Sequence, residues 1–267
     1  MPYNRERAKK RWSVELMKVY RQFCGWSTLQ KLVDAVEVGL KGPKGEVLIH
    51  DERERDEARA MIATVFETGA RICEVIGQGE HFPGLKCKDI IVLEDRVNVI
   101  FNIEKRYRKK VEVTKYKATD GTFMRWDNEE EAKESGHPYI AYRGYITERV
   151  IEIRNIVFPK AEPLAPTMIA WAEKVKMEKG EDAKLFNIKY SRAYRIVKAA
   201  GEKIGLDFPP HRLRAERATQ ILQEYGFTDH ELTEWFAWES PAIAHKYTTM
   251  MPKIIDKMFK IRHDALS

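Results

Sequence analysis

Apolar residues recur at helical spacing in several segments of this 267-residue chain. The segment 51–69 is the clearest, because its apolar positions from Ala58 to Phe66 repeat every three or four residues. Gly69 follows as a C-terminal helix stop, and Arg71 stands on the turn into another short helix. Further helices are predicted at 27–40, 167–180, 191–205, 211–226, 229–238 and 252–266.

A short helix carrying Tyr247 is predicted near the end of the chain. Ser240 can cap the free N–H groups of a helix, and Pro241 fits the first helical position. Tyr247 then lies about two turns into this helix. Taken alone, it is more simply read as a packed aromatic than as a reactive one, because most tyrosines of this kind pack.

Strand character is confined to three short segments, 89–93, 97–103 and 109–114. They predict a small antiparallel sheet whose last hairpin turn falls near Arg106 to Arg108. Residues 118–165 contain an acidic patch at 127–134 and several turn signals. We therefore expect an insertion with weak structure between the sheet and the later helices.

The composition indicates a globular protein with a sizeable core and is compatible with an anionic partner. Hydrophobic residues make up 43% of the chain, and 47 Lys and Arg against 41 Asp and Glu give a net charge of +6 and a pI of about 9.0. Basic residues gather at 1–24 and 105–117. Each cluster could also be an ordinary solvated face, so charge alone leaves a polyanion as one of two interpretations.

Several classes of protein are disfavoured by what the sequence contains. Cys24, Cys73 and Cys87 are odd in number and form no C-x-x-C pair, so neither a disulfide framework nor a zinc site is indicated. Apolar runs are too short for a membrane span, and common nucleotide-binding and zinc-protease motifs are missing. We expect a soluble, cytoplasmic protein without metal or cofactor.

His211 and Arg214 fall on the same face as the apolar residues of the helix at 211–226. An arginine that points toward the core is costly unless an anion meets it. A carboxylate from a neighbouring helix would satisfy it. A phosphate would do so equally well, because the free N–H groups of a first helical turn also favour an anion.

Three segments together resemble the signature boxes of the tyrosine recombinase, or phage integrase, family: 69–75, 211–219 and 234–247. The residues at the family's positions are Arg71 with the acidic Glu74, His211, Arg214, Trp238 and Tyr247. The interval 247 − 238 = 9 is the family's spacing. Each box alone is a weak pattern, but their order and spacing together are specific.

The family's lysine belongs on the small hairpin between the first two boxes. We assign it to Lys105, with Lys109 and Lys110 as rivals on the return strand. Arg106, Arg108, Lys109 and Lys110 are expected to bind DNA. Two departures from the family pattern stand out. Ala237 replaces the usual glycine before Trp238, and the residues after Arg214 are Ala-Glu-Arg and not the frequent His-Thr-Phe.

The resemblance implies a mixed α/β (α+β) fold, mostly helical with a small antiparallel sheet, like a tyrosine recombinase catalytic domain. Residues 27–250 would form this domain with an insertion at about 118–165. Residues 1–26 would be a basic segment, a possible remnant of a core-binding domain, and 251–267 an amphipathic helix that docks on a neighbouring protomer.

The resemblance also implies a function. It indicates a nucleoid-associated, site-specific recombinase that acts on double-stranded DNA as a homotetramer and is a monomer or weak oligomer without DNA. It would act through a 3′-phosphotyrosine and without metal, ATP or membrane. The same chemistry would serve a type IB topoisomerase-like or telomere-resolving enzyme. A DNA-binding module that keeps the fold without catalysis is a further alternative.

Overall fold

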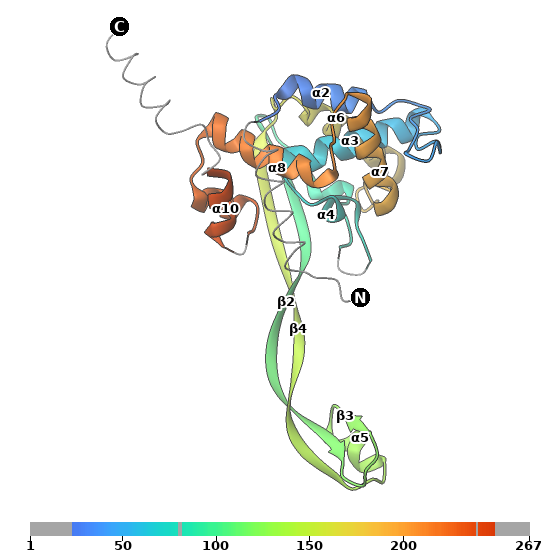
Figure 1. The fold of residues 1–267 in the computed structure, drawn as a ribbon, viewed down its shortest axis with the longest axis vertical. Coiled ribbons are helices and arrows are strands. Elements are labelled where there is room, and N and C mark those ends of the chain that lie inside the picture. Colours follow the sequence, from blue (N-terminus) through green and yellow to red (C-terminus); the bar gives the residue numbers. More distant parts are fainter. Residues whose placement is uncertain (1–22, 80–81, 239, 249–267) are drawn as a thin grey trace, which may run out of the picture. The chain divides into compact units, whose positions relative to one another are not determined.

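The computed structural model describes residues 23–79, 82–238 and 240–248, and at 103–111, 146–152 and 245–248 only their backbone. The chain divides into two compact units (Figure 1). The first comprises residues up to Asn102 together with those from Ile153 onward, and the second comprises Ile103–Glu152.

The first unit is built mainly from helices (Figure 1). Its elements are α2 (Trp26–Asp34), α3 (Glu52–Thr68), α4 (Ile72–Ile76), the 3₁₀ turn η1 (Cys87–Asp89), β1 (Ile90–Val92), α6 (Ala165–Lys179), α7 (Tyr190–Lys203), α8 (Pro210–Gln220), the π-helical turn η2 (Ile221–Tyr225), α9 (Asp229–Trp235) and α10 (Pro241–Thr248). Two long strands, β2 (Arg96–Ala118) and β4 (Tyr139–Pro159), contribute residues to both units.

Helix α3 forms the centre of the first unit, and its ends are set by local sequence signals. The side chain of Asp51 accepts a hydrogen bond of 2.8 Å from the backbone N–H of Glu54, which caps the start of the helix. Gly69 ends it in the left-handed conformation, with φ 59°. Residues 60–68 are buried, and the helix packs against α2, α4, α6, α7 and α8. The helix predicted at 51–69 is therefore confirmed.

The sheet confirms the strand predicted at 89–93 and overturns two other predictions, one of a turn and one of a weakly structured segment. β1 pairs antiparallel with the start of β2, as expected. However, β2 runs unbroken from Arg96 to Ala118, so the hairpin turn predicted near Arg106 to Arg108 is wrong. The weak structure predicted at 118–165 is also wrong, because β4 occupies Tyr139–Pro159 and pairs with β2. A basic run resembles a turn locally, yet pairing with a distant strand keeps it extended.

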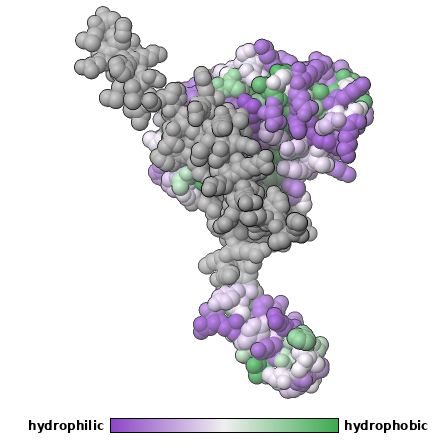
Figure 2. All heavy atoms as spheres, in the orientation of Figure 1, coloured by the Kyte–Doolittle hydropathy of each residue, from purple (hydrophilic) through white to green (hydrophobic). Residues whose placement is uncertain are grey.

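The second unit has its own small elements between the two long strands. β3 (Arg125–Trp126) pairs antiparallel with β2, and α5 (Glu129–Glu134) follows, capped by the side chain of Asn128. The tip is closed by a bond of 2.9 Å from the N–H of Thr119 to the carbonyl of Pro138. Figure 2 shows hydrophobic and hydrophilic residues mixed on the surface of this unit.

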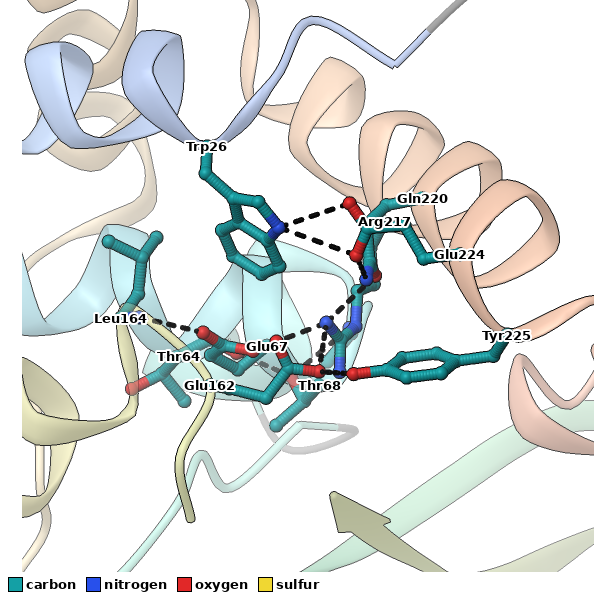
Figure 3. A network of polar contacts seen from close by, with 11 residues as sticks. Trp26, Thr64, Glu67, Thr68, Glu162, Leu164, Arg217, Gln220, Glu224 and Tyr225 are labelled. Carbon is teal, nitrogen blue, oxygen red and sulfur yellow. Dashed lines mark hydrogen bonds and ion pairs between the residues drawn. The ribbon is translucent and has the colours of Figure 1, made fainter. Parts of the chain in front are cut away.

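A buried polar network joins α3, α8 and η2 in the first unit (Figure 3). At its centre lies Arg217, only 1% exposed. Its Nη1 lies 3.0 Å from Oε1 of Glu162 and 3.3 Å from Oε2 of Glu67. Tyr225 donates its hydroxyl to Glu162 at 2.8 Å. One guanidinium thus faces two carboxylates, so the cluster carries an excess negative charge unless one carboxyl holds a proton.

That proton belongs to Glu67. Burial raises the pKa of Glu67 to about 8; the positive charge of Arg217 opposes the rise, and the negative charge of Glu162 adds to it. The Oε1 of Glu67 also accepts a hydrogen bond of 3.0 Å from the backbone N–H of Leu164. The network therefore binds α3 to the segment that leads into α6, with a carboxyl that is neutral at pH 7.

We expect Glu67→Gln to flatten the pH dependence of stability. Because the folded protein holds a proton on Glu67 that the unfolded chain loses near pH 4.5, the Glu67 contribution falls as pH rises from about 4.5 to about 8. The total change is on the order of a few kcal/mol, since each pKa unit is worth about 1.4 kcal/mol. Urea unfolding at pH 5 and pH 8.5 measures it for both proteins. Parallel curves for the two proteins would contradict a neutral Glu67.

The expected fold class is confirmed: the chain is mostly helical, with small antiparallel sheets. Across the described ranges, no helix has both the length and the apolar character needed to cross a membrane. The amphipathic helix predicted at 252–266 and most of the basic N-terminal segment lie outside the described residues.

Candidate anion-binding active site

A pocket of about 360 Å³ lies in the first unit, where α4, α7 and the start of α8 meet. Arg71, His211 and Arg214 line it, together with the half-exposed rings of Tyr190 and Tyr194 from α7. Arg71 precedes His211 by 211 − 71 = 140 positions, so only the fold brings it to the residues of α8. Two guanidiniums and an imidazole at one opening form a site suited to an anion.

Arg71 is held at the pocket by a buried carboxylate. It is the N-cap of α4, and its backbone N–H and its Nη1 both donate to the carboxylate of Glu74, each at 2.8 Å. Its side chain is 54% exposed, whereas that of Glu74 is fully buried. Burial by itself would raise the pKa of Glu74, but the charges of Arg154, Arg214 and Arg71 lower it. An ionised Glu74 thus orients Arg71 while leaving part of its guanidinium free for a ligand.

Arg214 is buried, as the helical pattern predicted. Pro209 and Pro210 start α8, which places Arg214 within its first turns. Its Nη1 donates to the carbonyl of Gly69 at 2.5 Å, and its Nη2 donates to the carbonyl of Phe236 at 2.6 Å. The guanidinium is thereby fixed between α3 and the end of α9.

His211 differs from the prediction that it would project inward with Arg214, because it is exposed to solvent at the pocket. Although exposed, its imidazole has enough protein around it for partial desolvation to lower its pKa, and the positive charges of Arg214 and Arg71 lower it further. A lowered pKa keeps the ring neutral at pH 7. A neutral imidazole can accept a proton.

An aromatic pair covers the side of the guanidinium of Arg214. Phe236 and Trp238 stack with centroids 4.7 Å apart, and the guanidinium lies 4.9 Å from the first ring and 5.9 Å from the second. A Cβ added to Gly69 would lie 2.3 Å from the Phe236 ring, so glycine is needed at that position. The ring of Trp238 therefore lies beside Arg214.

Ala237 explains why a glycine is usual at its position. It has φ 47°, and among the described residues it is the one non-glycine residue with a positive φ. The left-handed region costs an L-residue roughly 1–2 kcal/mol. The backbone after α9 is thus strained at Ala237, which stands in the sequence between the stacked residues Phe236 and Trp238.

Tyr247 lies on α10, where the structure describes only its backbone. The helix start predicted at Ser240 and Pro241 is confirmed, because the hydroxyl of Ser240 accepts a bond of 3.0 Å from the N–H of Ala242. Ala244 is fully buried in an apolar cluster with residues of α8, η2 and α9. Tyr247 therefore follows, by about one turn, the residue that anchors α10 to the helix carrying His211 and Arg214.

The predicted lysine and the basic DNA contacts lie in the second unit. They lie close together on β2, and the structure describes only their backbone: Lys105, Arg106, Arg108, Lys109 and Lys110. The assignment of Lys105 stays a prediction.

Arg154 is a buried residue beside the site that the sequence did not indicate. It lies on β4 in the first unit, with its Nη2 3.2 Å from Glu74 Oε2 and its Nη1 3.3 Å from the carbonyl of Phe236. It was missed because residues 118–165 were expected to have weak structure. The alternation of residues in 150–158 was the available strand signal.

No cluster of three or more His, Cys, Asp or Glu side chains that could hold a metal ion occurs in the part of the chain that the structure describes. The charged residues that line the pocket, Arg71 and Arg214, are both cationic, which suits an anionic ligand rather than a metal ion.

Comparison with known proteins relates these features to other chains. The sequence matches the phage integrase family over residues 47–253. Tyrosine recombinase XerA of Saccharolobus solfataricus is 47% identical over 49 residues, which are 18% of this chain and 16% of the relative.

Two crystal structures of the XerH site-specific recombinase are similar in fold. The pre-cleavage complex with difH substrate has a TM-score of 0.49 and 14% identity, over 85% of this chain and 50% of that one. The post-cleavage complex with palindromic difH substrate has a TM-score of 0.50 and 13% identity, over 92% and 54% of the two chains. The chain thus spans about half the length of these solved structures.

Proposed function

Because this chain belongs to the phage integrase family, we propose that it is a site-specific DNA recombinase that cleaves and rejoins DNA through a covalent 3′-phosphotyrosine. The observation that carries the proposal is the pocket that gathers Arg71, His211 and Arg214. The whole protein's substrates and assembly are part of the proposal, since the match to each relative covers only part of that relative.

The two arginines fit the charge of the transition state. In-line attack on a phosphodiester concentrates negative charge on the non-bridging oxygens, and guanidiniums can stabilise it by paired hydrogen bonds. Arg214 is fixed in advance by two backbone carbonyls, and Arg71 by Glu74. Little reorganisation is then needed when the charge develops. No step in this mechanism requires a metal ion or ATP.

Two proton transfers accompany the cleavage. The hydroxyl of Tyr247 attacks the phosphorus, and neutral His211 accepts its proton, because a phenol with a pKa near 10 is a weak nucleophile at neutral pH. The 5′-oxygen leaves and takes a proton from Lys105. Trp238 has only an N–H donor, so it holds the phosphate and packs beside Arg214 without taking part in proton transfer.

Strand exchange needs partners beyond one active site. Double-stranded DNA is the substrate, contacted by Arg106, Arg108, Lys109 and Lys110, and four copies assemble on it. Residues 27–250 act as the catalytic domain with an insertion at about 118–165, and residues 251–267 dock on a neighbouring copy.

An assay for a covalent adduct tests the proposal. The protein is incubated with supercoiled plasmid, treated with SDS, and examined for DNA that carries bound protein. We expect an adduct and, with two sites, exchanged products. DNA that is retarded on a native gel without any adduct would indicate the inactive DNA-binding module instead. Relaxation without exchange between two sites would indicate the topoisomerase-like alternative.

A further inference from the structure

We propose that Arg154 is a positioning residue that holds Arg71 and Arg214 in place, because it shares one hydrogen-bond acceptor with each of them. This inference rests on the proposed function, because the two arginines are its phosphate-binding groups. Arg154 does not belong to the described residues that line the pocket. It therefore acts through its neighbours and does not touch the reacting phosphate.

The shared acceptors are Glu74 and the carbonyl of Phe236. Glu74 accepts a hydrogen bond on each carboxylate oxygen. Nη1 of Arg71 donates to Oε1 at 2.8 Å, and Nη2 of Arg154 donates to Oε2 at 3.2 Å. The Phe236 carbonyl receives Nη2 of Arg214 at 2.6 Å and Nη1 of Arg154 at 3.3 Å. One planar guanidinium therefore reaches the support of each pocket arginine with a separate nitrogen. A fork of this kind fixes geometry that a single point charge does not.

Burial makes this arrangement rigid. The side chain of Arg154 is 5% exposed, and its guanidinium lies 5.0 Å from the ring of Phe101 on β2. Breaking a buried charge pair is costly because the remaining charge is left without compensation. Arg154 thus ties the strand β4 to α4 and to the end of α9, behind the pocket.

The charge of Arg154 also keeps Glu74 ionised. The charged groups that face Glu74 are Arg154 from β4, Arg214 from α8 and Arg71 from its own helix, and the thiol of Cys73 adjoins it. Burial opposes ionisation, and Arg154 is the largest of the influences that lower the pKa of Glu74. Without Arg154, Glu74 would be protonated at a higher pH and would hold Arg71 less firmly.

The test measures the single-turnover rate of adduct formation at saturating DNA as a function of pH. In Arg154→Met we expect a loss of ~10²-fold near neutral pH, the size associated with a misplacement of about 1 Å. Part of the rate should return at higher pH, because Glu74 then ionises. The acid limb of the pH–rate profile should therefore shift to higher pH than in the parent. Adding Glu74→Gln should remove that shift. The dissociation constant for DNA should change little.

Two further variants separate positioning from general stability. Arg154→Lys keeps the charge but cannot reach both acceptors, so it should lose part of the rate while its acid limb stays near that of the parent. Arg217→Met removes a buried arginine from the separate network around Glu67. It should lower the melting temperature without moving the acid limb. Each variant is assayed below its own melting temperature, and Arg154→Lys decides the matter if Arg154→Met does not fold.

A readout that needs no cleavage distinguishes this inference from the proposed function. Inorganic phosphate should raise the melting temperature of the parent through the pocket, and should do so less in both Arg154 variants but equally in Arg217→Met. A parent that binds phosphate but forms no adduct would overturn the proposed function alone. Parental rates, pH profiles and phosphate shifts in both Arg154 variants would overturn the positioning role.

Discussion

Tyr247→Phe should abolish the covalent protein–DNA adduct and leave DNA binding intact. The substitution deletes one oxygen and preserves the ring, so the packing of α10 on the apolar cluster around Ala244 is retained. Without the hydroxyl no phosphotyrosine bond can form, and the expected loss is complete within the sensitivity of the assay. The measurement is the fraction of a nicked suicide substrate that carries protein after SDS, beside a gel-shift titration of the same DNA.

Tyr225→Phe is the matched control for this experiment. Tyr225 is the first tyrosine before Tyr247 in the sequence, and its hydroxyl donates a hydrogen bond to Glu162. Burial and this bond raise the pKa of Tyr225 to about 12, which makes it a poor nucleophile. The control variant should form adduct at the parental rate. An adduct that persists in Tyr247→Phe and disappears in Tyr225→Phe would show that the nucleophile has been assigned to the wrong residue.

Lys105→Ala should slow cleavage by ~10²–10⁴-fold, the loss typical of a missing general acid. The departing 5′-oxygen would then leave without a proton. Replacing that bridging oxygen with sulfur gives a leaving group that needs no proton, since a thiolate is far more stable than an alkoxide. Lys105→Ala should therefore cleave the sulfur substrate about as fast as the parent does. Single-turnover rates on the oxygen and sulfur substrates measure the effect.

Lys109→Ala and Lys110→Ala serve as controls on the same strand. Because β2 is continuous, all three lysines lie on one strand and none on a return strand. The two control variants should weaken DNA binding through lost phosphate contacts, with no selective recovery on the sulfur substrate. Recovery in Lys109→Ala or Lys110→Ala, and not in Lys105→Ala, would move the general acid to that position.

Local signals in the sequence were sufficient for much of the helical fold. Asp51 and Gly69 fix the ends of α3, and Ser240 with Pro241 fixes the start of α10, because capping depends on residues only a few positions apart. The order and spacing of three short motifs also predicted which residues to examine, and the structure brings Arg71, His211 and Arg214 to one pocket.

The sheet could not be predicted in the same way. A short apolar run identified β1, and alternation identified the first part of β2. However, the extent of a strand depends on its partner, and the partner of β2 begins at Tyr139, well beyond the predicted turn. A run such as Lys105 to Lys110 has weak strand preference by itself. Pairing with β4 supplies hydrogen bonds that no local pattern records.

The sequence by itself therefore determined the family resemblance, the helical elements and the candidate catalytic residues, since these follow from residue type and short-range spacing. Only the tertiary structure decided the course of the long strands, the exposed position of His211, the neutral Glu67 beside Arg217, and the place of Arg154 behind the pocket. These features depend on burial and on contacts between residues far apart in the chain, and the physical reason is that desolvation and pairing arise only once those residues meet.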